Sequence, residues 1–280
     1  MSTFTLYDAT LGTLDLSHDN GYLIEEFDAG SPDVRSAVYD RPGSHGVADE
    51  SRFFGARTIN IGGKLKATSS RTRDDIQQRL MAYLLPNKRP MLRWTRDGIT
   101  REITVRVDRL SQKVQFAVDD FNISWRAEPF WRGMLLKEVP VPFTNVTTLE
   151  GVSFNWSFDI TFGSGSGTIS EVEVTNSGVV ETFPNIIIYG DANFPTIENL
   201  TTQKKLKVNV SMNPDDTLEI DTYRHTIIYN STSDVFSEID FDVSSWWNLQ
   251  SGVNRIKLTA ETLPSGAPPF AVLRYTELFM

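Results

Sequence analysis

Short runs in which apolar and polar residues alternate recur along most of this chain, and they restrict the folds open to it. In residues 99–110, Ile103, Val105 and Val107 alternate with charged or polar residues. A period of two residues is typical of a β-strand with one buried face and one face in water. Similar runs, separated by turn residues, return every ten residues or so through the second half. The sequence therefore predicts a mainly β protein.

In the first half, the same pattern predicts strands at residues 23–27 and 56–66. Between them, residues 31–51 contain Gly, Pro, Asp and Arg but few large apolar side chains. We expect a long exposed loop or arm there, because a compact domain rarely contains a structureless segment of this length without a function.

Two residue pairs that contain aspartate predict tight turns further along the chain. Asp97-Gly98 tolerates positive φ and predicts a hairpin between residues 91–95 and 99–110. Asp119-Asp120 predicts a second tight turn between two further strands.

One helix is expected, over residues 73–85. Thr72 and Asp75 have the spacing of a capping box, in which each side chain accepts a hydrogen bond from a backbone N–H of the first turn. Pro86 ends the helix. Its apolar face should lie on a sheet and consists of Ile76, Leu80, Tyr83 and Leu84.

The second half reads as a sandwich or jelly roll built from short strands. Residues 154–162 alternate cleanly, and the glycine-rich residues 163–167 resemble a flexible hairpin loop more than a phosphate-binding loop, since no Lys-Ser/Thr follows them. Later strands are expected at residues 184–190, 205–212, 217–222, 224–229, 235–243, 253–260 and 270–278.

Charge divides the 280 residues into two parts. Residues 1–133 contain 19 Lys and Arg against 18 Asp and Glu, whereas residues 134–280 contain 8 against 18. We read this change as a domain boundary and predict a first domain at 1–133, a linker at 134–145 and a second domain at 146–280. The acidic second half argues against nucleic-acid binding, and no apolar stretch is long enough to insert into a membrane.

Residue patterns for catalysis are weak. The chain has no cysteine, and its three histidines have no second ligand at metal-binding spacing. No serine lies in a G-x-S-x-G turn. Asp215, Asp216, Glu219 and Asp221 could hold calcium, but a solvated hairpin explains them better. The sequence therefore predicts neither an enzyme nor a cofactor.

Several motifs, taken in order, resemble the distal tail proteins (Dit) of siphovirus-type bacteriophages. In the first half they are the stretch from Phe53 to Leu65, the helix, Leu84-Leu85-Pro86, Met91-Leu92-Arg93-Trp94, Asp97-Gly98 and Glu128-Pro129-Phe130-Trp131. In the second half they are Asn176-Ser177-Gly178, Phe183-Pro184-Asn185-Ile186, residues 218–222, Trp247-Asn248-Leu249 and Gly252-Val253-Asn254.

The resemblance implies an N-terminal β-sandwich or split-barrel-like belt domain with one packed helix, and a C-terminal jelly roll of the galectin-like or carbohydrate-module-like type. It further implies that six copies form a ring at the tip of the tail tube, with the C-terminal domains projecting outward. The expected partners are copies of the chain itself, the tail tube protein, the tail-tip hub protein, and tape-measure or receptor-binding proteins. The expected location is the virion tail tip, after assembly in the host cytoplasm.

Two sets of residues are candidates for contacts. Arg57, Arg93, Arg101 and Arg106 are candidate subunit-interface residues, because arginine suits contacts with carboxylates of a neighbouring copy; ordinary solvated arginines are the alternative. Trp246 and Trp247 are candidate contacts for a host-surface glycan, with sheet packing as the alternative. A carbohydrate-binding adsorption module is thus the second functional hypothesis.

Overall fold

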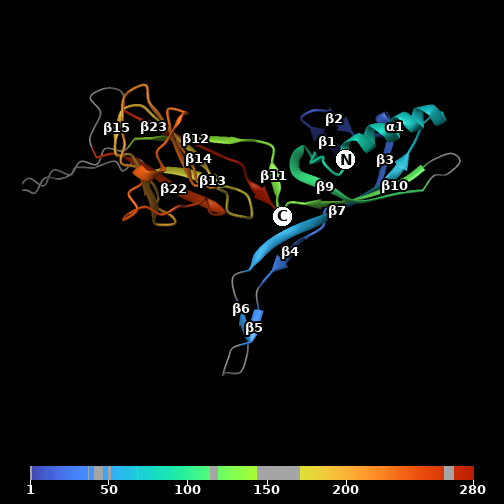
Figure 1. Ribbon diagram of the computed structural model, residues 1–280, viewed down its shortest axis with the longest axis horizontal. Helices are drawn as coiled ribbons and strands as arrows, with labels where there is room; N and C mark the ends of the chain where they lie inside the picture. Colours follow the sequence, from blue (N-terminus) through green and yellow to red (C-terminus); the bar gives the residue numbers. More distant parts are fainter. Residues whose placement is uncertain are drawn as a thin grey trace, which may run out of the picture. The chain divides into compact units, whose positions relative to one another are not determined.

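The computed structural model describes residues 2–36, 38–40, 47–49, 52–67, 69–113, 119–143, 171–261 and 268–280, which divide into two compact units (Figure 1). Unit 1 comprises Met1–Met134 with Leu278–Met280, and unit 2 comprises Leu135–Glu277. The predicted mainly β fold is confirmed. The last three residues, which were predicted to belong to the second domain, group instead with unit 1.

Unit 1 is a curled antiparallel sheet with one α-helix among its described residues. Its main path has the strand order β2-β1-β8-β9-β10-β7-β3. The elements are β1 (Thr3–Asp8), β2 (Gly12–Asp15), η1 (His18–Asn20), β3 (Tyr22–Asp28), β4 (Pro32–Arg35), β5 (Val38–Asp40), β6 (Val47–Asp49), β7 (Phe53–Leu65), α1 (Ser70–Tyr83), β8 (Met91–Arg96), β9 (Ile99–Lys113), β10 (Asp119–Ala127), β11 (Trp131–Gly133) and β24 (Leu278–Phe279).

The core of unit 1 lies between the curled sheet and the helix. The predicted apolar face of α1 is confirmed, since Leu80, Tyr83 and Leu84 are buried and Ile76 packs against them. The helix begins three residues earlier than predicted. Ser69 is its N-cap and its hydroxyl accepts a hydrogen bond from the Thr72 N–H at 3.2 Å, so the Thr72–Asp75 capping box is wrong.

The predicted hairpin is confirmed as β8 and β9, with Asp97 at φ 52° and Gly98 at φ 80°. The predicted turn at Asp119-Asp120 is wrong. Both residues begin β10, where they pair with Leu65 and Lys64 of β7, and Asp119 is buried in an ion pair with Arg73 at 3.4 Å. Cross-strand pairing outweighs the local turn preference here.

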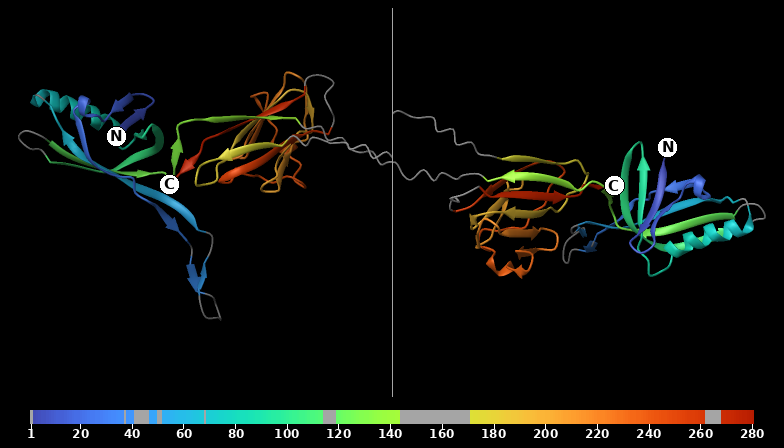
Figure 2. Two further views of the ribbon diagram at one scale, coloured as in Figure 1. Left: turned by 180° about the vertical axis from the view of Figure 1, so that it is seen from behind. Right: turned by 90° about the horizontal axis from the view of Figure 1, so that it is seen from above.

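The predicted loop or arm at residues 31–51 contains short paired strands. β4 pairs with the first part of β7, and β5 pairs with β6. Figure 2 shows β4 and β7 extending as a two-stranded arm beyond the part of unit 1 that α1 covers. Pairing satisfies the backbone N–H and C=O groups of a segment with few apolar side chains to bury. Val34, Phe53 and Phe54 of this arm are exposed.

The final strand of unit 1 comes from the far end of the sequence. β24 pairs with β11 through Trp131↔Phe279 and Arg132↔Leu278. The guanidinium of Arg101 lies 4.2 Å from the centre of the Phe279 ring. Trp131, fully buried, thus depends on residues that follow unit 2 in sequence.

Unit 2 is a sandwich in which two main sheets share one core. One sheet has the order β12-β23-β14-β19-β20-β21, the other has the order β13-β22-β16-β17, and β15 pairs with β18. The elements are β12 (Lys137–Pro142), β13 (Val172–Asn176), β14 (Asn185–Tyr189), β15 (Ala192–Asn193), β16 (Thr196–Asn199), β17 (Lys204–Lys207), β18 (Ser211–Met212), β19 (Thr217–Asp221), β20 (Thr226–Tyr229), β21 (Ser233–Asp234), η2 (Phe236–Glu238), β22 (Gly252–Thr259) and β23 (Phe270–Tyr275).

Two sequence expectations for this unit need correction, and two others lie outside the described residues. Part of the predicted linker forms β12, an edge strand, where Pro140 and Pro142 are tolerated because an edge has N–H groups that need no partner. The strand predicted at residues 235–243 is instead η2 followed by turns. The alternating run at residues 154–162, Trp156 included, and the glycine-rich residues 163–167 lie outside the described residues.

Candidate assembly interface

Unit 1 contains a four-stranded segment, β3-β7-β10-β9, that is open at both sides. β3 pairs with β7 alone among the described strands. β9 pairs with β8 only over Ile99–Thr104, and the Val105 N–H then donates to the Pro90 carbonyl. Beyond Val105, β9 pairs only with β10 in the described part of the chain. Such free edges offer rows of N–H and C=O groups to another strand.

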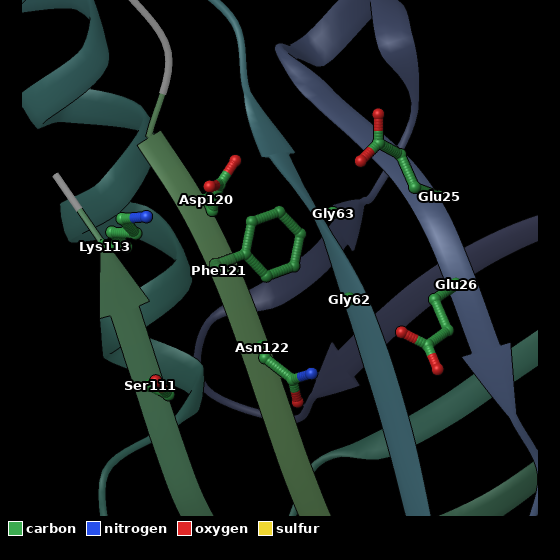
Figure 3. A pocket seen from close by; sticks show the side chains of 9 residues that line it. All are labelled: Glu25, Glu26, Gly62, Gly63, Ser111, Lys113, Asp120, Phe121 and Asn122. Atoms are coloured by element: carbon green, nitrogen blue, oxygen red, sulfur yellow. The ribbon is translucent and has the colours of Figure 1, made fainter. Parts of the chain in front are cut away.

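The two faces of this segment differ. Helix α1 covers one face, where the Tyr22 hydroxyl donates to the Ile76 carbonyl at 2.8 Å and the Gln77 side chain donates to Gln112 at 2.9 Å. Burial of the Tyr22 ring and hydroxyl raises its pKa to about 12. The opposite face is polar and holds a shallow hollow of about 240 Å³ (Figure 3).

A β-bulge shapes this hollow. The register between β3 and β7 shifts between Ile24 and Glu26, and the hollow is lined by both Glu25 and Glu26. Gly63 permits the bulge, because a Cβ there would lie 2.3 Å from the Leu23 carbonyl oxygen. Figure 3 shows Glu25 and Glu26 beside Gly62 and Gly63, across from Asn122 and Asp120 on β10. Lys64 forms an ion pair with Glu25 at 2.6 Å.

Arg57, a predicted interface residue, is buried with 2% exposure. Its Nε donates to the Pro129 carbonyl at 2.9 Å, and its Nη1 lies 3.4 Å from the Ala29 carbonyl. Desolvation lowers the pKa of its guanidinium. Arg57 therefore joins β7 to two neighbouring turns, and its side chain is not available to another molecule.

The other predicted arginines differ in exposure. Arg93 is half-buried, forms an ion pair with Glu102 at 3.1 Å and lies over the Tyr7 ring. Arg101 is half-buried beside Phe279 and lines a second cavity of about 230 Å³ with Trp94, Arg96 and Ile99. Arg106 is exposed on the free part of β9. Of the four, Arg106 is the residue best placed to contact another copy.

The two predicted tryptophans face different surroundings. Trp247 is a core residue with 2% exposure. Trp246 is half-buried, and its ring stacks on the His225 ring with centroids 4.5 Å apart and planes 16° apart. Phe236 stacks beside Trp246, and Phe241 packs against Phe236; both phenylalanines are exposed. Trp246 alone of the pair could contact a ligand.

The acidic residues near position 216 are used in separate local interactions. Asp216 accepts hydrogen bonds from the Tyr229 hydroxyl, the Asn213 N–H and the Asn230 amide, which together lower its pKa to about 2. Asp221 accepts from two backbone N–H groups, and Asn185 donates to Glu219. Within the described residues, no group of three or more His, Cys, Asp or Glu side chains could hold a metal.

The low pKa of Asp216 predicts an acid-sensitive turn. Because its folded pKa lies below the ordinary value of 3.8, the carboxylate stabilises the fold above about pH 4, and this stabilisation is lost as the pH falls towards 2. We expect the midpoint of thermal unfolding to fall less between pH 4 and pH 2 in Asp216→Asn than in the wild type. Asp215→Asn, at an exposed neighbour, is the control and should behave as the wild type. Equal pH slopes in all three proteins would contradict this role.

No helix in the described part of the chain is long and apolar enough to cross a membrane. No curated protein matches this chain. A family model described as the C-terminal domain of siphovirus-type tail components matches residues 177–279.

Two solved structures share the fold of the whole chain. SPP1 Dit, described as a paradigm of the hub adsorption apparatus in phages that infect Gram-positive bacteria, matches with a TM-score of 0.70 and 13% identity, over 100% of both chains. A chain of the phage P2 baseplate in its activated conformation with Ca matches with a TM-score of 0.50 and 12% identity, over 99% of this chain and 98% of the other.

The match covers unit 2 from β14 onward, so this part of the chain resembles the C-terminal domain of siphovirus-type tail components. The resemblance to the distal tail proteins, predicted from the ordered motifs, is confirmed.

Proposed function

We propose that this protein forms a closed ring, of six copies, at the distal end of a phage tail tube. Copies join head to tail through the free edges of the β3-β7-β10-β9 segment. The ring connects the tail tube protein to the tail-tip hub protein, with further contacts to tape-measure or receptor-binding proteins. The protein works in the virion tail tip and is assembled in the host cytoplasm.

The observation that carries the proposal is the open sheet segment. Successive strands in it are antiparallel, so β3 and β9 also run in opposite directions. A β3 strand placed against the free part of a neighbour's β9 would continue the antiparallel alternation. Strand addition at a sheet edge is a common way for proteins to associate.

Head-to-tail contacts also suit a ring. β3 and β9 are different surfaces, so each copy uses one edge for each neighbour, and the contact repeats until the rotation closes. The exposed arm of β4 and β7 gives a separate apolar surface, with Phe53 68% exposed. We assign this surface to a neighbouring tail protein, since exposed apolar patches mark interaction sites.

The mass of the protein in solution tests the ring. We expect light scattering of the purified full chain to give a species near six times 31.6 kDa, and negative-stain images to show closed rings. A strict monomer at high concentration, or open filaments in the images, would contradict the proposal.

No catalytic role belongs to this proposal. A zymogram on cell-wall material tests for hydrolysis, and we expect no clearing around the protein band.

A second candidate function is glycan binding by unit 2. The observation that favours it is the group of aromatic rings formed by Trp246, Phe236 and Phe241, since sugar rings pack on aromatic faces. Saturable binding on a glycan array that is lost in Trp246→Ala would support it. Trp247→Ala is unsuited to this test, because Trp247 belongs to the core.

A further inference from the structure

The polar face of the β3-β7-β10-β9 segment carries opposite charges at its two free edges. The acidic strip, on β3, consists of Glu25, Glu26 and Asp28. The basic strip, on β9, consists of Arg106, Arg109 and Lys113. All six side chains are exposed.

Both strips lie on the same face of the sheet. The core face of β3 carries Tyr22, Ile24 and Phe27, and the core face of β9 carries Val105, Val107 and Leu110. The charged residues alternate with these positions and so point to the opposite face. The hollow in Figure 3 is lined by residues of both edges, with Glu25 and Glu26 at one side and Ser111 and Lys113 at the other.

Several of these charges form no ion pair with any residue that the structure describes. Glu25 is paired with Lys64, but within the described residues Glu26, Arg106 and Arg109 form no ion pair. Arg106 lies directly opposite Arg126 of β10 in the strand register. Like charges in directly opposed positions are destabilising, so this pair would gain from an acidic neighbour. Asp108, exposed at a bulge of β9, is the one carboxylate between Arg106 and Arg109.

We infer that the acidic strip of one copy pairs with the basic strip of the next copy, and that this pairing sets the direction in which copies join. The inference rests on the proposed ring. When β3 extends the sheet beside a neighbour's β9, the polar faces of the two copies become continuous. The acidic strip then lies alongside the basic strip, where opposite charges in cross-strand positions attract.

The same charges disfavour the wrong contacts. Two β3 edges would place carboxylates against carboxylates, and two β9 edges would place guanidinium groups against each other. Either contact would give a closed two-fold pair that ends the ring. Charge patterns of this kind select partners and speed correct encounters more than they add affinity.

Charge reversal with rescue tests the inference in the full-length protein. The acidic-strip variant carries Glu25→Lys and Glu26→Lys, and the basic-strip variant carries Arg106→Glu and Arg109→Glu. Each alone brings like charges together, so we expect the concentration needed for assembly in sedimentation velocity to rise at least about tenfold. A mixture of the two variants, and a single chain that carries all four substitutions, should both assemble as the wild type does. Rescue in the mixture also shows that both variants fold.

Controls separate this inference from the ring itself. Glu181→Lys reverses an exposed charge of unit 2 that forms no ion pair with the described residues, and it should assemble normally. Wild-type assembly should weaken in high salt, which screens exposed charges. If the wild type forms rings but the variants assemble unchanged, or are not rescued by mixing, the charge pairing is wrong and the ring stands. A wild-type protein that stays monomeric overturns both.

Discussion

Gly30→Ala is expected to destabilise unit 1 by about 3 kcal/mol. Gly30 has φ 61°, and a Cβ at this position would lie 1.9 Å from the Thr58 carbonyl oxygen. The substitution therefore combines left-handed strain with a clash against backbone, which cannot move aside as a side chain can. The Gly30 N–H also donates a hydrogen bond to the Asp28 carboxylate at 2.9 Å, in the turn that leads into β4, and a shift of the backbone would weaken this bond.

Gly98→Ala is the matched control for this prediction. Gly98 has φ 80°, but nothing lies within 4 Å of an added Cβ. It should cost about 1 kcal/mol, from backbone strain alone. Urea denaturation curves of the two variants measure the difference. Equal midpoints would show that the turn at Gly30 relaxes and that the close approach to Thr58 does not hold the arm in place.

Arg57→Met should destabilise unit 1 by about 2–4 kcal/mol, because the part-buried carbonyl of Pro129 then loses its charged donor. Arg57→Lys should recover only part of the stability, since an ammonium group cannot reproduce the planar set of donors. Chemical denaturation of the full chain checks both values. Arg126→Met, at an exposed position on β10, is the control and should change stability by no more than about 0.5 kcal/mol.

This experiment also separates the structural role of Arg57 from the interface role that its residue type suggests. A structural Arg57 lowers stability when it is replaced. An interface Arg57 would weaken assembly and leave the unfolding curve unchanged. The second result would mean that the buried position described above is wrong.

Sequence patterns predicted the elements whose conformation depends mainly on residues close to one another in the chain. The helix, with Leu80 and Tyr83 on one face, and the Asp97-Gly98 hairpin were both found. The helix start was missed because Ser69 and Thr72 are both good N-cap residues and lie three positions apart. β12 was missed because proline argues against a strand except at a sheet edge, and edges are not visible in one sequence.

The strand period could have predicted the burial of Arg57 and Asp119, although charged residues are usually exposed. Arg57 precedes Ile59 and Ile61 at even spacing, and Asp119 precedes Phe121 and Ile123 in the same way, so each shares a face with buried residues. The period of the strand outweighs the usual exposure of charge when a partner is present. The free edges and the opposed strips, in contrast, depend on strand order, which the sequence pattern does not contain.

The pairing of β24 with β11 has a consequence for synthesis. A ribosome makes nearly all of unit 1 first, then the whole of unit 2, and only afterwards Leu278 and Phe279, which pair with β11. Unit 1 therefore cannot be completed until unit 2 has been made, and a chain released before Leu278 lacks the strand beside Trp131. Translation itself thus delays the maturation of the unit that carries the free sheet edges until β24 has been made.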